Sequence, residues 1–422
     1  MRFVVLALFA ANVAVGFTPS RLHEALPMRT LVGSSRLSPL RLPALSMTTT
    51  TGSGTGTGSS DFLDVAAVGS NATALASTPS TTVAVSVVLE STTTTATTTA
   101  TTIADRPPFP VVLWRFSRPH TLIGSALAIP ALHLMAANTL QTAFTRQNAA
   151  AALYAMIPAL LMNLFITGLN QITDVEIDKI NKPDLPIAAG ILHPKTAIVT
   201  VVTALIVSLW LGVASPLYST PGLNVALWGS GILGTLYSVE PFRLKRHPVL
   251  AALCIVAVRG TIINAGFFAH ARQAAFGETG ATVWSCLTQH PKCFRSSLFF
   301  AIFGVVIALM KDVPDVLGDQ SSNVRTFSVR IGQKRIFHAM RRLLTGLFVG
   351  VSVGFARAVP AATDGVLAAC RGVTAVLSLA AAWSVRKEAQ PVDPENSKQV
   401  YAFYMHLWKL FYLSYMVLPF AR

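Results

Sequence analysis

Long apolar stretches, each close to the thickness of a bilayer when helical, recur along this chain from about residue 120 to its end. A helix needs about 20 predominantly apolar residues to cross a membrane. Some stretches are short or contain Pro and Gly, which bundles of membrane helices tolerate. Their approximate ranges are 120–138, 149–169, 196–214, 222–239, 248–269, 296–311, 334–358, 362–385 and 400–420. The sequence therefore predicts an all-α membrane protein with about nine transmembrane helices.

Lys and Arg residues are distributed unequally between the two sides of these expected spans. The segment before the first span and every second loop after it carry 17 of them, against 5 in the remaining loops. Such a bias sets the orientation of a membrane protein. The net charge of +15 therefore describes one basic surface that faces anionic lipid and anionic substrates. We expect the lipid bilayer as a partner and no nucleic acid; the sequence indicates no protein partner.

Two acidic clusters stand out because carboxylates are scarce in this chain, with 18 acidic residues against 33 basic ones. From residue 105 onward there are 14 acidic residues, and six of them lie within residues 170–178 and 312–319, both on the basic-rich face. Ionisable groups at the edge of a membrane domain are usually functional. Carboxylates at short spacing suit Mg²⁺, and a cation would offset the repulsion between two clusters that meet. We predict a metal-bridged diphosphate site; the alternative is two solvated clusters without a ligand.

The spacing within each cluster indicates which residues would bind the metal. In the first cluster the ligands recur every four residues and would share one face of a helix; they are Asn170, Asp174 and Asp178. In the second cluster Pro314 and Gly318 argue against regular helix; its carboxylates are Asp312, Asp315 and Asp319. The acids expected to be essential for catalysis are Asp174, Asp178, Asp315 and Asp319.

Basic residues suited to phosphate oxygens lie near both clusters. Arg forms paired hydrogen bonds with phosphate, and Lys supplies a compact charge. A cation within an apolar span is expected to face the bundle interior and to meet an anion there. The alternative for the loop residues is that they only fix membrane orientation. The candidates for substrate binding are Arg118, Lys179, Tyr237, Arg243, Lys245, Arg246 and Arg259.

The stretch from Asn170 to Gly190 resembles the first motif of the UbiA superfamily of intramembrane aromatic prenyltransferases, and the stretch from Lys311 to Asp319 resembles the second. The resemblance covers about residues 112–420. One departure is Leu317, where these enzymes usually carry Glu. The resemblance implies a central cavity open sideways to lipid, one Mg²⁺ at each acidic cluster, and transfer of a prenyl group from its diphosphate to an aromatic acceptor.

Within that superfamily the chain is similar to the plastid homogentisate prenyltransferases. Residues 114–121 and 325–335 favour the phytyl-transferring branch, whereas residues 258–260 with Asn264 and Gly266 favour the solanesyl-transferring branch. The resemblance implies decarboxylating transfer of phytyl to homogentisate in tocopherol biosynthesis, with solanesyl transfer for plastoquinone as the alternative. A cation-coupled transporter would instead show inverted repeats and acids near the membrane centre, which we do not find in the sequence.

The first hundred residues have the composition of a targeting sequence. Residues 1–16 combine a basic start, a short apolar run and a small-residue cleavage pattern, as in a signal peptide, and residues 17–47 are basic and acid-poor, as in a transit peptide. Residues 48–105, rich in Thr, Ser and Gly, read as a disordered linker before a membrane domain at 106–422. This order resembles the bipartite presequences of algae with red-type plastids and predicts a plastid membrane, inner envelope or thylakoid; the alternative is plain secretion.

Overall fold

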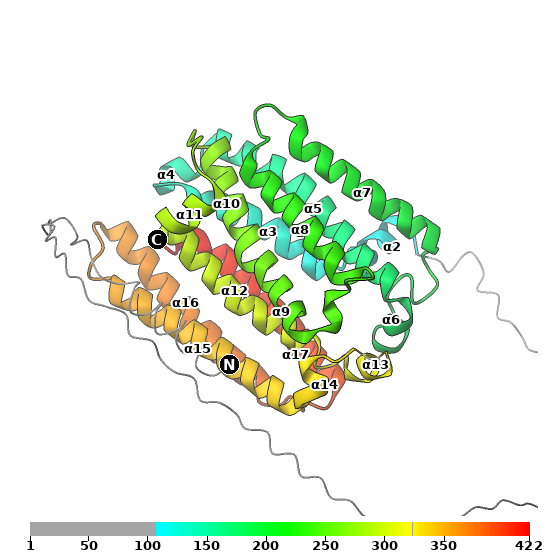
Figure 1. Cartoon of the computed structure of the whole chain (residues 1–422). Coiled ribbons are helices and arrows are strands. Elements are labelled where there is room, and N and C mark those ends of the chain that lie inside the picture. Colours follow the sequence, from blue (N-terminus) through cyan, green and yellow to red (C-terminus); the bar gives the residue numbers. More distant parts are fainter. Residues whose placement is uncertain (1–106, 323) are drawn as a thin grey trace, which may run out of the picture. The chain divides into compact units, whose positions relative to one another are not determined.

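The computed structural model describes residues 107–422, with the exception of residue 323. Every regular element in this part of the chain is a helix, so the predicted all-α class is confirmed (Figure 1). The expected signal peptide, transit peptide and linker lie outside the described residues, and those assignments stay predictions.

Nine long helical segments correspond to the nine apolar stretches of the sequence. They are α3 (Pro119–Ala136), α5 (Arg146–Thr173), α7 (Pro194–Ala214), α8 (Pro221–Ser238), the continuous run of α9 (Pro248–Val256), η3 (Ala257–Ile262) and α10 (Ile263–Ala274), α12 (Pro291–Lys311), α15 (Gln333–Ala358), α16 (Gly365–Ala389) and α17 (Ser397–Val417). Short helices lie between them: α2 (Phe109–Phe116), α4 (Leu140–Ala143), α6 (Val175–Asn181), η2 (Leu244–Arg246), α11 (Val283–Gln289), α13 (Val316–Ser321), α14 (Phe327–Ile331) and η4 (Leu418–Phe420).

Seven of the nine long segments are apolar and long enough to cross a membrane, and α8 and α17 are the two that fall outside this group. Both contain polar residues: α8 has Asn, Ser and Thr among its glycines, and α17 has Gln, His and Lys among its aromatic residues. The buried side of α17 is apolar and aromatic, and its polar residues Lys398, Gln399 and Lys409 are exposed. This helix is therefore amphipathic, with its apolar face packed into the bundle.

Proline and small residues explain where several helices begin and how closely they pack. The helices α3, α7, α8, α9 and α12 each begin with Pro, whose missing N–H costs nothing at a first helical position. At the contact of α8 with α10, a Cβ added to Gly222 would meet the main-chain atoms of Gly266 and His270 at 2.7 and 2.6 Å. Only glycine permits this approach, which is a common device for packing membrane helices.

The bundle interior between α12 and α17 is aromatic. Phe300 stacks on Tyr415 with ring centroids 3.9 Å apart, and Phe303 meets Phe411 edge to face. All four rings are buried. By contrast, α7 exposes apolar side chains such as Ile206 and Trp210, as expected for a helix that faces lipid.

The helices α6, α13 and α14 lie together at one end of the bundle, where α5 and α12 finish (Figure 1). The helices α6 and α13 pack against each other although about 140 residues separate them in sequence. Since α6 contains Asp178 of the first acidic cluster and α13 contains Asp319 of the second, this end of the bundle holds the candidate site.

Candidate active site

The two acidic clusters meet through contacts between the loops that carry them. The main-chain N–H of Gly318 donates to Oδ1 of Asn181 at 3.0 Å, which ties α13 to the end of α6. Lys182 forms an ion pair with Asp315 across the same contact. The structure therefore brings together the two sequence motifs that were predicted to form one site.

The local backbone differs from expectation in the first cluster. The sequence predicts one helical face through Asn170, Asp174 and Asp178, but α5 ends at Thr173 and α6 begins at Val175. Asp174 lies between them with φ −117° and ψ 17°. Interaction with the helix dipole favours the break, because it places the Asp174 and Asp178 carboxylates at the positive N-terminal end of α6. For the second cluster the expected interruption is confirmed: α12 ends at Lys311 and α13 begins at Val316.

Asp174 is the most heavily paired carboxylate of the site. Its Oδ1 accepts from Arg243 Nη2 at 3.0 Å and from Lys245, and its Oδ2 accepts from Asn170 Nδ2 at 2.9 Å. Arg243 has a left-handed φ of 32°, a strained conformation for an arginine. The loop after α8 thus places two of the predicted phosphate-binding cations directly against a predicted metal ligand.

Each of the other clustered carboxylates has its own electrostatic environment. Arg118 Nη2 lies 3.7 Å from Asp178 Oδ2, and Lys311 Nζ lies 3.4 Å from Asp312 Oδ1. Among the described residues no ion pair reaches Asp319, although its side chain is buried. Arg118 lies at the start of α3, Asp178 in the short helix α6 and Asp312 at the end of α12, so the site depends on the packing of several segments.

Burial and mutual repulsion make this site unfavourable for so many carboxylates. Burial raises the pKa of Asp178, with Arg118 and Lys182 opposing the shift. Burial also raises the pKa of Asp312, and burial together with Asp312 and Asp315 raises that of Asp319 to about 7. A bound cation would relieve both effects, since it favours the charged form of each carboxyl group.

The basic residues compensate only part of this negative charge. Burial lowers the pKa of Lys245 to about 8, although its contact with Asp174 opposes the shift. The same lysine is buried at 8% exposure, which is rare for Lys unless it is paired. Lys245 and Arg243 therefore lie where they can contact an anionic group that approaches the acidic clusters.

The donor set fits Mg²⁺. Four acidic side chains of the site are buried, and Asp178 Oδ2 has no hydrogen-bond partner among the described residues. Within the same part of the chain, no three His, Cys, Asp or Glu side chains are gathered closely enough to enclose an ion by themselves. Mg²⁺ does not require such a group, because it is usually held by one or two carboxylates together with water and substrate phosphates.

A cavity of about 230 Å³ extends into the bundle from Asn170 of the first cluster and from Lys311, which directly precedes the second cluster. Its polar lining includes Arg118, Asn170, Tyr237 and Lys311, and its deeper wall is apolar and aromatic. Lys311 Nζ lies 3.4 Å from Tyr237 Oη. The cavity is lined by α3, α5, α8, the α9–α10 run, α12 and α17, so a central cavity, as the family resemblance implies, is present.

Arg259 is separate from the other cations of this cavity. It lies on η3, a π-helical turn that interrupts the α9–α10 segment. Its guanidinium carbon lies 4.9 Å from the centroid of the Trp408 ring and 5.6 Å from that of Phe411. No acidic side chain within the described residues pairs with it. A partly buried cation held on aromatic faces is available for an anionic ligand.

The structure leaves two predicted substrate-binding residues outside the cluster and adds two others to it. Lys179 pairs with Glu176 at 2.7 Å, and Arg246 pairs with Glu240 at 2.8 Å; both cations are about half exposed. In their place Lys182 and Lys311 contact the acids. For Lys311 the available signal was proximity in sequence, because it directly precedes Asp312; Lys182 pairs with Asp315, which is distant in sequence.

Comparisons with known proteins agree in pointing to one family. A family model described as the UbiA prenyltransferase family matches residues 126–410. Homogentisate phytyltransferase 1 of Arabidopsis thaliana is 37% identical over 73% of this chain and 75% of its own. A homogentisate geranylgeranyltransferase of Triticum aestivum is 36% identical over 73% and 72%, and the homogentisate solanesyltransferase of Arabidopsis thaliana is 34% identical over 73% and 75%.

Among solved structures, a UbiA homolog from Archaeoglobus fulgidus bound to DMAPP and Mg²⁺ is similar with a TM-score of 0.47 and 16% identity. The similarity covers 73% of this chain and 98% of that one.

Proposed function

The chain belongs to the UbiA prenyltransferase family, and from this premise we propose that it transfers a phytyl group from phytyl diphosphate to homogentisate with loss of CO₂, as in tocopherol biosynthesis. The observation that carries the proposal is the meeting of two acidic clusters, 130 or more residues apart in sequence, with Arg118, Lys182, Arg243 and Lys245 around them. Alternating positive and negative groups of this kind suit a diphosphate and its divalent cations.

In this proposal the acidic clusters hold the metal and the basic residues hold the diphosphate. Asn170, Asp174 and Asp178 would bind one Mg²⁺, and Asp312, Asp315 and Asp319 the other. When bound, Mg²⁺ would neutralise the charge that develops on the leaving diphosphate. Arg118, Lys182, Arg243, Lys245 and Lys311 would exchange their carboxylate partners for phosphate oxygens. Lys179 and Arg246, which are exposed and paired elsewhere, would act at most as the substrate enters.

The cavity would then protect the reacting centre from water. The bond between the allylic carbon and the diphosphate oxygen breaks, and the leaving diphosphate keeps the electron pair. The ring of homogentisate attacks the allylic cation and forms the new carbon–carbon bond. The ring loses a proton, and the acetate side chain loses CO₂ and gains a proton to become a methyl group. Aromatic residues such as Trp408 would exclude water and stabilise the cation by their ring faces.

Arg259 is the residue that we assign to the acceptor. Homogentisate carries its carboxylate on an acetate side chain of an aromatic ring, and Arg259 offers a cation beside Trp408 and Phe411 within the same cavity. The sequence interpretation had placed Arg259 among the diphosphate contacts. Its aromatic surroundings and its lack of an acidic neighbour within the described residues favour a carboxylate with an aromatic body instead.

The choice of phytyl as donor depends on particular stretches of sequence. Residues 114–121 and 325–335 support it, whereas residues 258–260 support solanesyl. The relatives that use phytyl, geranylgeranyl and solanesyl groups, by their names, are 37%, 36% and 34% identical. The three identities are nearly equal, and a competition between donors therefore decides the assignment.

The test is a competition between donors. Membranes from a heterologous host that express the chain would be incubated with homogentisate, Mg²⁺ and equal concentrations of phytyl, geranylgeranyl and solanesyl diphosphate. We expect phytyl products to dominate, with geranylgeranyl products second and solanesyl products least. Dominant solanesyl transfer would replace the proposed role with one in plastoquinone synthesis, and no homogentisate product from any donor would reject the acceptor.

The protein is a multi-pass membrane protein, and we propose that it resides in a plastid membrane. Relatives with chloroplast locations in their names support this location. The amino-terminal composition described above supports it independently.

A further inference from the structure

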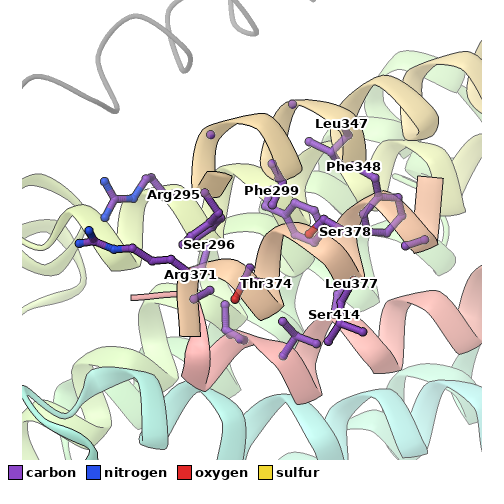
Figure 2. A pocket seen from close by; sticks show the side chains of 18 of the residues that line it. Arg295, Ser296, Phe299, Leu347, Phe348, Arg371, Thr374, Leu377, Ser378 and Ser414 are labelled. Carbon is purple, nitrogen blue, oxygen red and sulfur yellow. The ribbon is translucent and has the colours of Figure 1, made fainter. Parts of the chain in front are cut away.

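A second and larger cavity lies between α12, α15, α16 and α17, away from the acidic clusters. Its volume is about 1060 Å³, at the upper end of the range for small-molecule sites. Most of its lining is apolar, including Phe299, Leu347, Phe348 and Leu377 (Figure 2). The proposed transfer reaction makes no use of this cavity.

All the ionisable residues that line this cavity are cations. They are Lys292, Arg295, Arg357, Arg371 and Arg422. Chain direction places them at one end of the cavity, because α12 and α16 begin there and α15 and η4 end there. Figure 2 shows the Arg295 and Arg371 side chains extending in the same direction beyond the row of apolar side chains. The cavity thus has an apolar body and a basic mouth.

The described part of the chain offers these five cations no acidic partner. None of them forms an ion pair there, and no Asp or Glu lines the cavity. Arg371 donates through Nη1 to the carbonyl of Ala358 at 2.5 Å and through Nε to the main-chain oxygen of Arg422 at 3.2 Å, and Arg422 Nη2 donates to the carbonyl of Leu134 at 2.8 Å. These contacts hold both side chains in place. Positive charge is therefore concentrated at the mouth with no Asp or Glu of the described residues paired to it, which favours an anion.

The mouth is remote from the proposed active site. Arg295 precedes Lys311 by 16 residues on the same helix, which corresponds to about 24 Å along the helix axis. A prenyl diphosphate is bound through divalent cations and therefore needs carboxylates, and this cavity has none. An anionic glycerolipid needs only a basic mouth for its headgroup and apolar walls for its acyl chains, as in other basic pockets between membrane helices.

From this geometry we propose that the cavity between α12, α15, α16 and α17 binds an anionic membrane glycerolipid. The phosphate or sulfonate of the headgroup contacts Arg295, Arg357 and Arg371 at the mouth, and the acyl chains lie against the apolar walls. This inference does not depend on the proposed transferase reaction.

The experiment measures lipid selectivity on the full chain. The protein would be purified in detergent micelles with equal amounts of dioleoyl phosphatidylglycerol and dioleoyl phosphatidylcholine, and bound lipid would be counted by native mass spectrometry. We expect phosphatidylglycerol to exceed phosphatidylcholine by at least about tenfold, since each basic residue near an anionic headgroup adds about fivefold to binding. In the double variant Arg295→Gln, Arg357→Gln the excess should fall to about twofold or less.

The matched control is Arg335→Gln, Arg342→Gln, which removes two exposed cations from α15 outside the cavity. This control should keep the wild-type preference. If the double variant at the mouth does not fold, as judged by its melting curve, the single variant Arg295→Gln takes its place with a smaller expected loss.

Equal binding of the two lipids to wild type, or an unchanged preference in the mouth variants, would overturn the proposal. Displacement of bound phosphatidylglycerol by micromolar phytyl diphosphate would also overturn it, because the cavity would then belong to the prenyl donor. Retained transferase activity in the mouth variants distinguishes this test from a failure of the proposed function.

Discussion

At the scale of single residues, the proposed metal site requires the carboxylates of Asp174 and Asp178. Changing either to Asn keeps the side-chain volume but removes the negative charge that would bind Mg²⁺. Because metal ions supply several kcal/mol of charge stabilisation, we expect transfer to fall by at least about 100-fold. The measurement is product formation in membranes at several Mg²⁺ concentrations, with insertion checked by protease protection.

Glu176→Gln is the matched control for these variants, because Glu176 lies between Asp174 and Asp178 in sequence but is exposed, and within residues 107–422 its ion-pair partner is Lys179 alone. It should keep nearly full activity. Full activity in Asp174→Asn or Asp178→Asn, with unchanged metal dependence, would remove both residues from the metal site.

Arg259 provides a second prediction, with a different kinetic signature. Arg259→Gln should raise the KM for homogentisate by about 10-fold or more while the KM for the prenyl diphosphate changes little, since a charge-assisted hydrogen bond contributes about 1.5–3 kcal/mol. Steady-state kinetics with each substrate varied in turn separates the two constants. A rise confined to the diphosphate KM would return Arg259 to the role that the sequence interpretation gave it.

The residues of this site differed in how far sequence could identify them. Asp174 and Asp315 were predicted because carboxylates are rare in this chain and lie at the ends of long apolar runs. Arg243 and Lys245 were predicted because Arg and Lys side chains bind phosphate oxygens. Lys182 was not singled out as a site residue, since its contact with Asp315 exists only after α6 and α13 have packed together. Contacts between distant segments depend on tertiary structure, which spacing along the chain does not contain.

At the scale of helices, the join between α6 and α13 holds the two halves of the site together. A Cβ added to Gly318 would collide with the amide group of Asn181, which accepts the Gly318 N–H. Gly318→Ala should therefore separate the acidic clusters and lower activity strongly, at a stability cost of about 1–3 kcal/mol for overpacking. Transfer activity and the melting temperature of the purified protein are the two measurements.

The control is Gly346→Ala, on α15, where an added Cβ would meet nothing within 4 Å. Alanine also has the higher helix propensity, so this variant should be as active as wild type and equally or more stable. Equal activity of Gly318→Ala and wild type would show that the close approach of α13 to Asn181 is not needed for the site.

Sequence was a good guide to the long helices and a poor guide to their irregularities. The expected first span, 120–138, corresponds to α3 at Pro119–Ala136, because a membrane imposes both length and composition on a helix. The π-helical turn at Ala257–Ile262 and the break at Asp174 were not predicted. Both irregularities lie where side chains of other helices line the site. Helix propensity depends on the local sequence and does not reflect these neighbours.

At the scale of the whole molecule, the two ends of the bundle, as the described residues form it, carry two different candidate binding sites. One end carries the acidic clusters with their paired cations, and the other carries the basic mouth of the larger cavity. Charge is thus concentrated at both ends, while helices such as α7 expose apolar residues between them. This distribution agrees with a protein whose substrates and lipid ligands approach from the bilayer with their charged groups at its surfaces.

We propose that the first hundred residues serve as a targeting sequence and are not part of the enzyme. Deleting residues 1–47 should leave transferase activity intact when the remaining chain is expressed in a host without plastids, since all the site residues lie beyond residue 110. The same deletion should abolish delivery to the plastid.

Changing Phe17 to Ala alone should stop a fluorescent fusion at an earlier compartment, because the import machinery would recognise this residue after signal cleavage. Ser20→Ala, a similar small change three residues on, is the control and should leave delivery unchanged. A Phe17→Ala fusion that still reaches the plastid interior would refute the proposed signal peptide and transit peptide, and would favour a simple secretory signal.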